Sequence, residues 1–130
     1  MIQQPYVKTK IKEFTDLIVW QEGHKLVLLI YEITGKFPMK EKYSLIDQMR
    51  RAVTSITSNI AEGFGRHSYR EKTQFYYLSQ GSLTELKNQL LIARDIKYFD
   101  EKTYLILSEK ANFTHQLLQG LIKKTKSFIL

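Results

Sequence analysis

The sequence of 130 residues contains no cysteine, which excludes disulfide bonds and metal sites built from thiolates. A chain without cysteine fits a reducing compartment, so we expect a cytoplasmic protein. No stretch approaches the roughly 18 apolar residues of a membrane-spanning helix, and residues 1–10 lack the apolar core of a signal peptide. We therefore expect no membrane partner.

Proline is also scarce, and its placement points to helices. Pro5 and Pro38 lie outside every segment with a regular apolar repeat, and no segment alternates with the two-residue period of a strand. A chain of this length fits one domain. The sequence therefore predicts an all-α protein with one folded domain over residues 15–130, preceded by a flexible arm over residues 1–14.

Capping and turn residues divide the domain into four predicted helices. These run from Thr15 or Asp16 to Gly35, from Ser44 to Gly63–Gly65, from Ser68 to about Lys97, and from Asp100 to about Lys126. Because the connections are short, sequential helices should pack antiparallel. The predicted fold is an up-down-up-down four-helix bundle.

Two of the predicted helices carry more apolar surface than one bundle needs. The helix over 15–35 is apolar on two sides, and the helix over 68–97 has a second apolar stripe at seven-residue spacing. In that helix we assign Phe75, Leu78, Ser82, Leu86 and Ala93 to the inward face. The remaining apolar surface predicts a homo-oligomer. Its candidate interface residues are Val19, Leu26, Ile30, Ile33, Tyr76, Leu83 and Leu90.

Catalytic signatures are missing. Di-metal bundles need Glu-x-x-His pairs, and no such pair occurs; His24, His67 and His115 are isolated from one another in sequence. His24 shares a face with Trp20 and Tyr31, which predicts a hydrogen-bonded core histidine. No zinc motif, phosphate-binding glycine loop or nucleophile elbow appears, and Gly81 with Ser82 indicates a close helix approach. We therefore predict a protein that is not an enzyme and has no catalytic residue, cofactor or metal.

The helix over 44–65 carries a polar stripe opposite its apolar face, formed by Arg51, Ser55, Ser58, Asn59 and Glu62. The stripe fits a groove that contacts a ligand or RNA. It also fits a solvated face or a subunit contact in which small side chains let helices approach. The second interpretation is favoured, because the arginine and the glutamate can satisfy each other.

The formal charge of +7 is concentrated at one end of the predicted bundle. In an antiparallel bundle, both chain ends and the turn between the second and third helices lie together. This basic end collects nine basic and four acidic side chains, a balance of +5. The basic residues are Lys8, Lys10, Lys12, Arg66, Arg70, Lys72, Lys123, Lys124 and Lys126, and the acidic ones are Glu13, Asp16, Glu62 and Glu71.

A basic end of this kind favours a polyanionic partner, RNA or DNA. The candidate nucleic-acid-binding residues are Arg66, Arg70, Lys72, Lys123, Lys124 and Lys126. Phe64, His67 and Tyr69 lie among them and can stack on exposed bases. The alternative is a protein-protein interaction scaffold, in which the cations only complement the helix dipoles and keep the protein in solution.

Four motifs occur in a characteristic order between residues 14 and 122. They are Phe14-x-Asp-Leu-x-Val-Trp-Gln21 with His24, Gln48-x-Arg-Arg-Ala52, Ser58-Asn-Ile-Ala-Glu-Gly63 and Gly81-Ser-Leu-x-Glu-Leu86. With these motifs the chain resembles the bacterial family of 23S ribosomal RNA intervening-sequence proteins.

The resemblance implies an antiparallel four-helix bundle that is commonly a homopentamer with a central pore, and it supplies no catalytic residue. The family also includes the accessory protein of diversity-generating retroelements, which binds nucleic acid and partners a reverse transcriptase. This chain departs from the family pattern at Gly23, where alanine is usual, and at Thr57, where proline is usual. The turn after Gly65 also carries fewer lysines and arginines than is usual.

Overall fold

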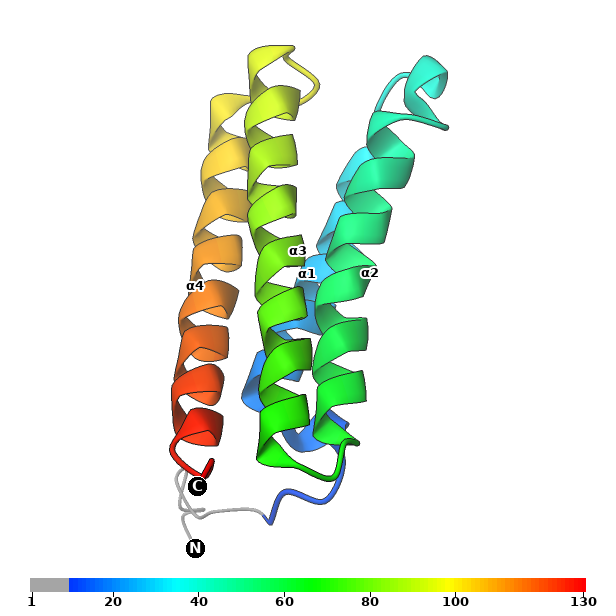
Figure 1. Cartoon of the computed structure of the whole chain (residues 1–130). Helices are drawn as coiled ribbons and strands as arrows, with labels where there is room; N and C mark the ends of the chain where they lie inside the picture. The colour runs from blue at the N-terminus through cyan, green and yellow to red at the C-terminus, as the bar shows by residue number, and fades with distance from the viewer. Residues whose placement is uncertain (1–9) are drawn as a thin grey trace, which may run out of the picture.

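The computed structural model describes residues 10–130 and consists of four long helices and two short 3-10 turns (Figure 1). The helices are α1 (Ile18–Thr34), α2 (Leu45–Phe64), α3 (Tyr69–Asp95) and α4 (Glu101–Lys126), with 3-10 turns at Phe14–Asp16 and Met39–Glu41. No strand occurs among residues 10–130. The predicted arm over residues 1–14 lies mostly outside the described residues, so its flexibility stays a prediction.

The helices form a closed ring around one core. Each helix packs on the next along the chain, and α4 returns to pack on α1. The start of α1, the α2–α3 connection and the C-terminus lie at the same end of the bundle (Figure 1). The predicted antiparallel four-helix bundle is therefore confirmed.

Two of the predicted caps are present. The Ser68 hydroxyl accepts a hydrogen bond from the Glu71 backbone N–H at 3.1 Å, and the Asp100 carboxylate accepts one from the Thr103 N–H at 2.8 Å. The start of α1 was predicted slightly too early. Asp16 belongs to the preceding 3-10 turn, where backbone N–H groups of Glu13 and Lys12 bind its carboxylate and lower its pKa.

Helix α3 ends in a Schellman motif. The Tyr98 N–H donates to the Ala93 carbonyl at 2.9 Å, and the Lys97 N–H donates to the Arg94 carbonyl at 3.0 Å. This geometry places Lys97 in the left-handed region, with a φ of 65°. Glycine normally occupies this position, because a Cβ is unfavourable there.

We expect Lys97→Gly to raise the free energy of unfolding by about 1 kcal/mol, because the left-handed conformation no longer carries a Cβ. Urea denaturation measures the change. Lys97→Ala is the matched control, since it removes the same charge and keeps the Cβ. A gain of equal size in both variants would contradict the conformational explanation.

The apolar face of α2, which lies opposite its polar stripe, is buried in the core. Its six members lie within the core, and Leu107, Ala111, Leu118 and Ile122 of α4 belong to the same core. The α2 residues are Leu45, Met49, Ala52, Val53, Ile56 and Ile60. This regular stripe lets α2 bury one whole face.

The faces predicted for α1 and α3 need a correction. Six of the seven candidate interface residues are no more than 5% exposed within one chain, and Ile33 packs partly buried against the same core. These residues form the interior of the bundle rather than a subunit contact; the six are Val19, Leu26, Ile30, Tyr76, Leu83 and Leu90. Conversely, Leu78 was assigned inward and is 57% exposed. Both helices are apolar on two sides, so periodicity alone could not choose the inner one.

Close approach of α2 and α3 occurs at Gly63. A Cβ at this position would lie 2.8 Å from Cε1 of Tyr76 and 2.9 Å from Cβ of Phe75. The close approach predicted at Gly81 is wrong within the single chain, because Gly81 is exposed and nothing lies within 4 Å of the position that a Cβ would occupy there. Its neighbour Ser82 does contact α2, donating a hydrogen bond to Ser55 at 2.8 Å.

We expect Gly63→Ala to lower the free energy of unfolding by about 1–3 kcal/mol, because the methyl group overpacks the contact with Tyr76. Gly81→Ala is the matched comparison. It should raise stability by up to about 1 kcal/mol, because alanine is the better helix former and meets no neighbour. Thermal or urea unfolding of both variants measures this, and a loss at Gly81 would indicate that its surface is covered in the assembled protein.

Candidate nucleic-acid interface

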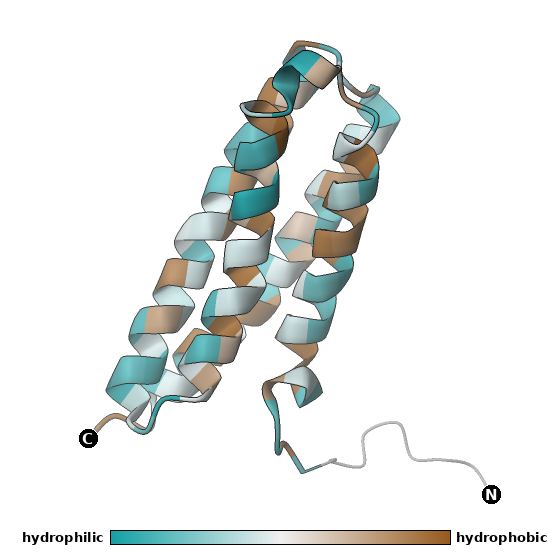
Figure 2. Ribbon diagram, turned by 90° about the vertical axis from the view of Figure 1, so that its right-hand side faces the viewer, coloured by the Kyte–Doolittle hydropathy of each residue, from teal (hydrophilic) through white to brown (hydrophobic). Residues whose placement is uncertain are grey.

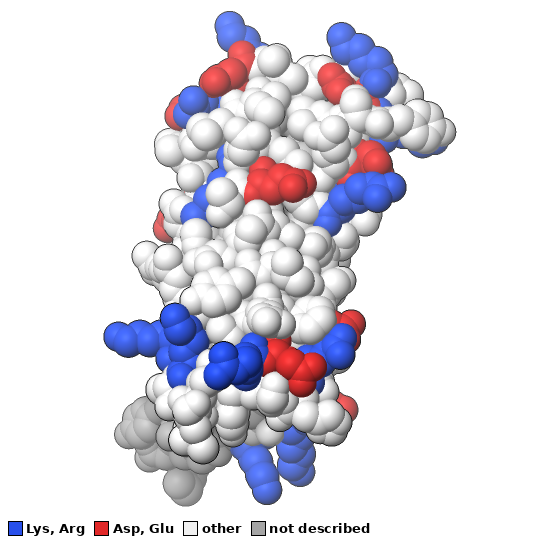
Figure 3. Space-filling view, in the orientation of Figure 1, with Lys and Arg blue, Asp and Glu red and all other residues white. Residues whose placement is uncertain are grey.

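The basic end carries eight basic and four acidic side chains among the described residues, since Lys8 lies outside them. In Figure 3 a group of Lys and Arg side chains gathers toward this end of the bundle, and the band above it carries few charges. The six candidate binding residues divide into two groups. Arg66, Arg70 and Lys72 lie at the α2–α3 connection, and Lys123, Lys124 and Lys126 lie in the last turns of α4.

In the first group, two cations are already used within the fold. Arg66 forms an ion pair with Glu62 at 3.0 Å, and its guanidinium carbon lies 4.5 Å from the ring centre of Phe75. Lys72 donates a hydrogen bond to the Phe64 carbonyl at 2.5 Å, where it caps the end of α2. Burial lowers the pKa of Lys72. Arg70 is exposed and takes part in no ion pair of the described chain.

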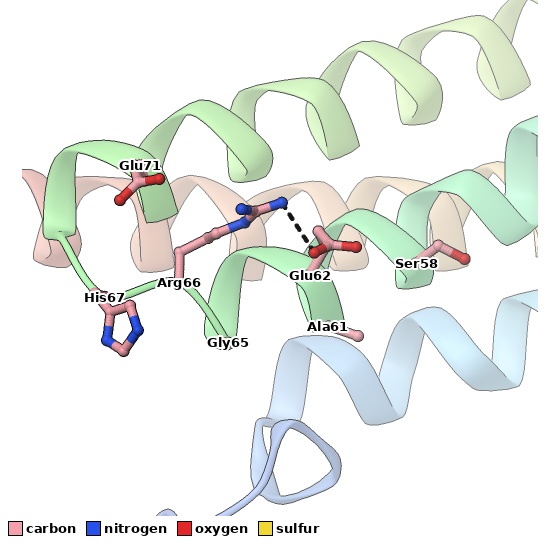
Figure 4. A pocket seen from close by; sticks show the side chains of 7 residues that line it. All are labelled: Ser58, Ala61, Glu62, Gly65, Arg66, His67 and Glu71. Carbon is pink, nitrogen blue, oxygen red and sulfur yellow. Dashed lines mark hydrogen bonds and ion pairs between the residues drawn. The ribbon is translucent and has the colours of Figure 1, made fainter.

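A hollow of about 600 Å³ lies beside this connection (Figure 4). Ala61 and Gly65 line it with small side chains, and Glu62 and Glu71 add two carboxylates against the single guanidinium of Arg66. The His67 ring points away from the Arg66–Glu62 pair (Figure 4). A lining with more carboxylates than cations repels phosphate, so this hollow is a poor site for a polyanion.

The second group is different, because its lysines are exposed. Within the described chain, no ion pair involves Lys123, Lys124 or Lys126. Lys126 instead donates a hydrogen bond to the Tyr77 hydroxyl at 3.2 Å. Three cations without a carboxylate partner can bind phosphate without first breaking an ion pair.

A groove of about 290 Å³ between α3 and α4 adjoins these lysines. Its lining contains no carboxylate and consists of Tyr77, Gln80, Gln119, Ile122, Lys123 and Lys126. Sequence reasoning missed the tyrosine and both glutamines. Tyr77 and Lys126 are 49 residues apart, and only the packing register of α3 against α4 brings them together.

The aromatic residues at this end differ in their availability. Tyr69 is exposed as expected, and it stacks on Phe128 with 5.0 Å between ring centres. Phe128 was missed by the sequence analysis. Phe64 is half-buried, with the Lys72 ammonium 5.3 Å from its ring centre. His67 is exposed.

The polar stripe of α2 is largely used within the fold. The Ser55 hydroxyl accepts hydrogen bonds from Ser82 at 2.8 Å and from Asn59 at 3.0 Å, so it joins α2 to α3. Arg51 pairs with Asp47 at 3.0 Å. The small polar side chains therefore serve a helix contact inside one chain.

His24 does not lie in the core. It is exposed and stacks on Trp20, with 4.8 Å between ring centres. The expectation of a core histidine is therefore wrong. The error arose because this side of α1 is buried only in part: Trp20 packs against the core, whereas His24 and Tyr31 are exposed.

His115 forms a polar cluster across the α3–α4 contact. Its Nδ1 lies 2.6 Å from the Lys87 ammonium, and its Nε2 lies 3.1 Å from the Gln80 amide. Burial first, and the charge of Lys87 second, lower the pKa of His115. A neutral ring accepts from Lys87 at Nδ1, which leaves its proton on Nε2. Gln80 accepts that proton when its amide oxygen, rather than its nitrogen, is turned toward the ring.

We expect Lys87→Met to raise the pKa of His115 part of the way to its usual value, because the burial that contributes more remains. NMR titration of the ring protons measures the shift.

The lowered pKa of His115 also predicts how stability depends on pH. Since the unfolded chain binds the proton more readily, wild-type stability is lost as the pH falls from the unfolded pKa of 6.5 through the folded one. His115→Gln should remove this contribution, and an unchanged pH dependence in that variant would contradict it.

The described residues contain neither a metal-binding cluster nor a membrane-spanning helix. Over residues 10–130, no group of three or more His, Asp or Glu side chains is placed to hold a metal ion. None of the helices in the same range is long and apolar enough to cross a membrane.

The sequence and the fold both match one protein family. The sequence profile of the family described as 23S rRNA-intervening sequence protein matches residues 15–120. The chain belongs to the 23S rRNA-intervening sequence protein family. The resemblance drawn from the four motifs is thereby confirmed. The comparison with curated proteins gave no significant match.

The family fold is also seen in a solved structure. The chain is similar to a protein from Bacteroides thetaiotaomicron VPI-5482, described as a protein with unknown function from the S23 ribosomal protein family. The TM-score is 0.74 at 18% identity, and the alignment covers 82% of this chain and 99% of the other. At this identity, the likeness shows that the two share a fold.

The intervening-sequence family match ends at residue 120, before the lysines at the end of α4. Arg66, Arg70 and Lys72 lie inside the matched segment, whereas Lys123 and Lys126 lie outside it. The role of the α4 lysines therefore has to be argued from the geometry of this chain.

Proposed function

We propose that this protein is a non-enzymatic homo-oligomer that binds RNA or DNA electrostatically through its basic end. The observation that supports the proposal best is the group of α4 lysines. Lys123, Lys124 and Lys126 lie together, are exposed, and pair with no carboxylate of the described chain. Such a group releases counterions when it binds phosphates, so the affinity should fall steeply with salt.

The cations at the α2–α3 connection support the same proposal. Arg66 and Lys72 are held within the fold, so they contribute to the field of the basic end without being free to rearrange around a ligand. Arg70 remains exposed beside them. The α4 lysines and Arg70 are therefore the residues proposed to contact phosphates, and binding should depend weakly on base sequence.

The proposed oligomer would use apolar residues that stay exposed on one chain. They lie on α1, α3 and α4, and apolar segments recur along the helices (Figure 2). They include Ile18, Leu28, Leu78, Leu105 and Phe113. A pentamer is the assembly expected from the family resemblance. Repeating the basic end around a symmetric assembly would strengthen its field, because the charges of all subunits add.

An alternative is a protein-protein interaction scaffold without a nucleic-acid role. The same exposed apolar side chains favour it, because they offer surface to a protein partner. In this alternative the lysines of α4 only complement the helix dipole and keep the protein in solution. The two proposals differ in what happens when those lysines are neutralised.

We expect the triple variant Lys123→Gln, Lys124→Gln and Lys126→Gln to lose RNA and DNA binding, because up to three phosphate contacts disappear. Fluorescence anisotropy at about 50 and 200 mM salt measures the affinity. The slope of log affinity against log salt should fall by about one for each lost contact.

The matched control neutralises three lysines at the opposite end, Lys36, Lys40 and Lys42, and should bind as the wild type does. Light scattering should show the same oligomer for wild type and both triple variants. Equal binding by the two triple variants would reject the α4 lysines as the site. No binding by the wild type at the lower salt would favour the scaffold.

A further inference from the structure

We propose that the groove between α3 and α4 binds an unpaired nucleotide, with its base stacked on Tyr77 and its phosphates on Lys123 and Lys126. This inference rests on the proposed function and narrows it to single-stranded RNA or DNA. It assigns the recognition of a base to one side chain, whereas the α4 lysines alone would contact only phosphate.

The position of Lys126 leaves the faces of the Tyr77 ring uncovered by its ammonium. The Lys126 Nζ lies 3.2 Å from the hydroxyl oxygen and 5.8 Å from the ring centre. The distance from the ammonium to the ring centre nearly equals its distance to the hydroxyl oxygen plus the distance from that oxygen to the ring centre. The ammonium therefore lies beyond the hydroxyl edge and close to the ring plane. Tyr77 is 45% exposed, so a base has room to approach a face of the ring.

This arrangement contains the two elements that proteins use to bind an unpaired strand. Proteins that bind unpaired strands combine an aromatic platform for a base with cations along the backbone path. Here the platform is Tyr77, and the cations at its edge are Lys126 and Lys123, which line the same groove. Gln119 also lines the groove and is exposed, so its amide can bond a base edge.

The charge of the groove separates it from the hollow at the α2–α3 connection. That hollow has two carboxylates and one guanidinium in its lining, whereas the groove has two ammonium groups and no carboxylate. A phosphate is therefore attracted to the groove and repelled from the hollow. Of these two hollows, the groove is the one whose charge suits a nucleotide.

The size of the groove and the chemistry of stacking select an unpaired strand. Its volume of about 290 Å³ is close to the lower limit of small-molecule sites, roughly 300 Å³, and a double helix cannot enter it. The base faces of a duplex are covered by neighbouring base pairs. A tyrosine face can stack only on a base that is free of such neighbours.

The chain offers a matched control for a tyrosine beside a lysine. Tyr43, near the opposite end of the bundle, is 86% exposed, and the Lys42 ammonium lies 5.4 Å from its ring centre. Tyr43 lines none of the hollows described above. A tyrosine and a lysine that are adjacent but outside the groove should therefore contribute nothing to binding.

The experiment compares three labelled ligands by fluorescence anisotropy at low salt. They are a uridine oligonucleotide of about ten residues, an abasic strand of equal length and charge, and a duplex. Tyr77→Leu should weaken binding of the uridine strand about 5- to 100-fold and leave binding of the abasic strand and of the duplex unchanged, because only the uridine strand offers a free base to stack. Tyr77→Phe should bind within about twofold of wild type, and Tyr43→Leu should match wild type.

The outcomes separate this inference from the proposed function. Equal affinity of the wild type for uridine and abasic strands would overturn the inference without any variant. Equal weakening by Tyr77→Leu and Tyr43→Leu would overturn it too. If either result accompanies loss of binding in the α4 triple variant, electrostatic binding stands without base stacking. If the wild type binds none of the ligands, both proposals fail. A deoxyuridine strand of equal length tests whether the sugar 2′-hydroxyl contributes.

Discussion

The close contact between α2 and α3 is the constraint on which the rest of the structure depends. Gly63 lets the backbone of α2 approach Phe75 and Tyr76, and the Ser79 hydroxyl donates a hydrogen bond to the Ile56 carbonyl at 2.8 Å inside the core. Together with the Ser82–Ser55 hydrogen bond, these contacts fix the rotation of α3 about its axis. With that rotation fixed, Tyr76 points inward, and its neighbour Tyr77 turns toward α4 and its lysines.

Local signals sufficed to predict the helices, and they were insufficient to predict which face is inside. The caps at Ser68 and Asp100 depend on a few neighbouring residues, so the sequence alone placed them correctly. The inner faces of α1 and α3 depend on what the other helices present. Leu83 and Leu90 therefore looked like a surplus stripe until the contact at Gly63 turned them inward.

The candidate site was also predicted only in part from the sequence. Composition and antiparallel packing predicted the basic end, which includes the six candidate binding residues, because counting charges needs only the order of the helices. Whether each cation is held within the fold or is available to a ligand depends on contacts between helices. Lys72 reaches the Phe64 carbonyl and Arg66 reaches Glu62, whereas Lys126 reaches a tyrosine hydroxyl and no carboxylate of residues 10–130. No pattern in the sequence distinguishes a lysine that caps a helix from one that faces a groove.

Two of the residues that depart from the pattern expected from the family resemblance, Gly23 and Thr57, lie in contact. A Cβ on Gly23 would lie 3.0 Å from Cγ2 of Thr57, so the missing methyl group on α1 makes room for the threonine on α2. Glycine by itself weakens a helix, and the β-branched side chain of threonine needs space beside the backbone. Together they form one complementary contact. Any side chain at position 23 would have to displace the Thr57 methyl group, so the spacing of α1 and α2 at this level depends on the two residues together.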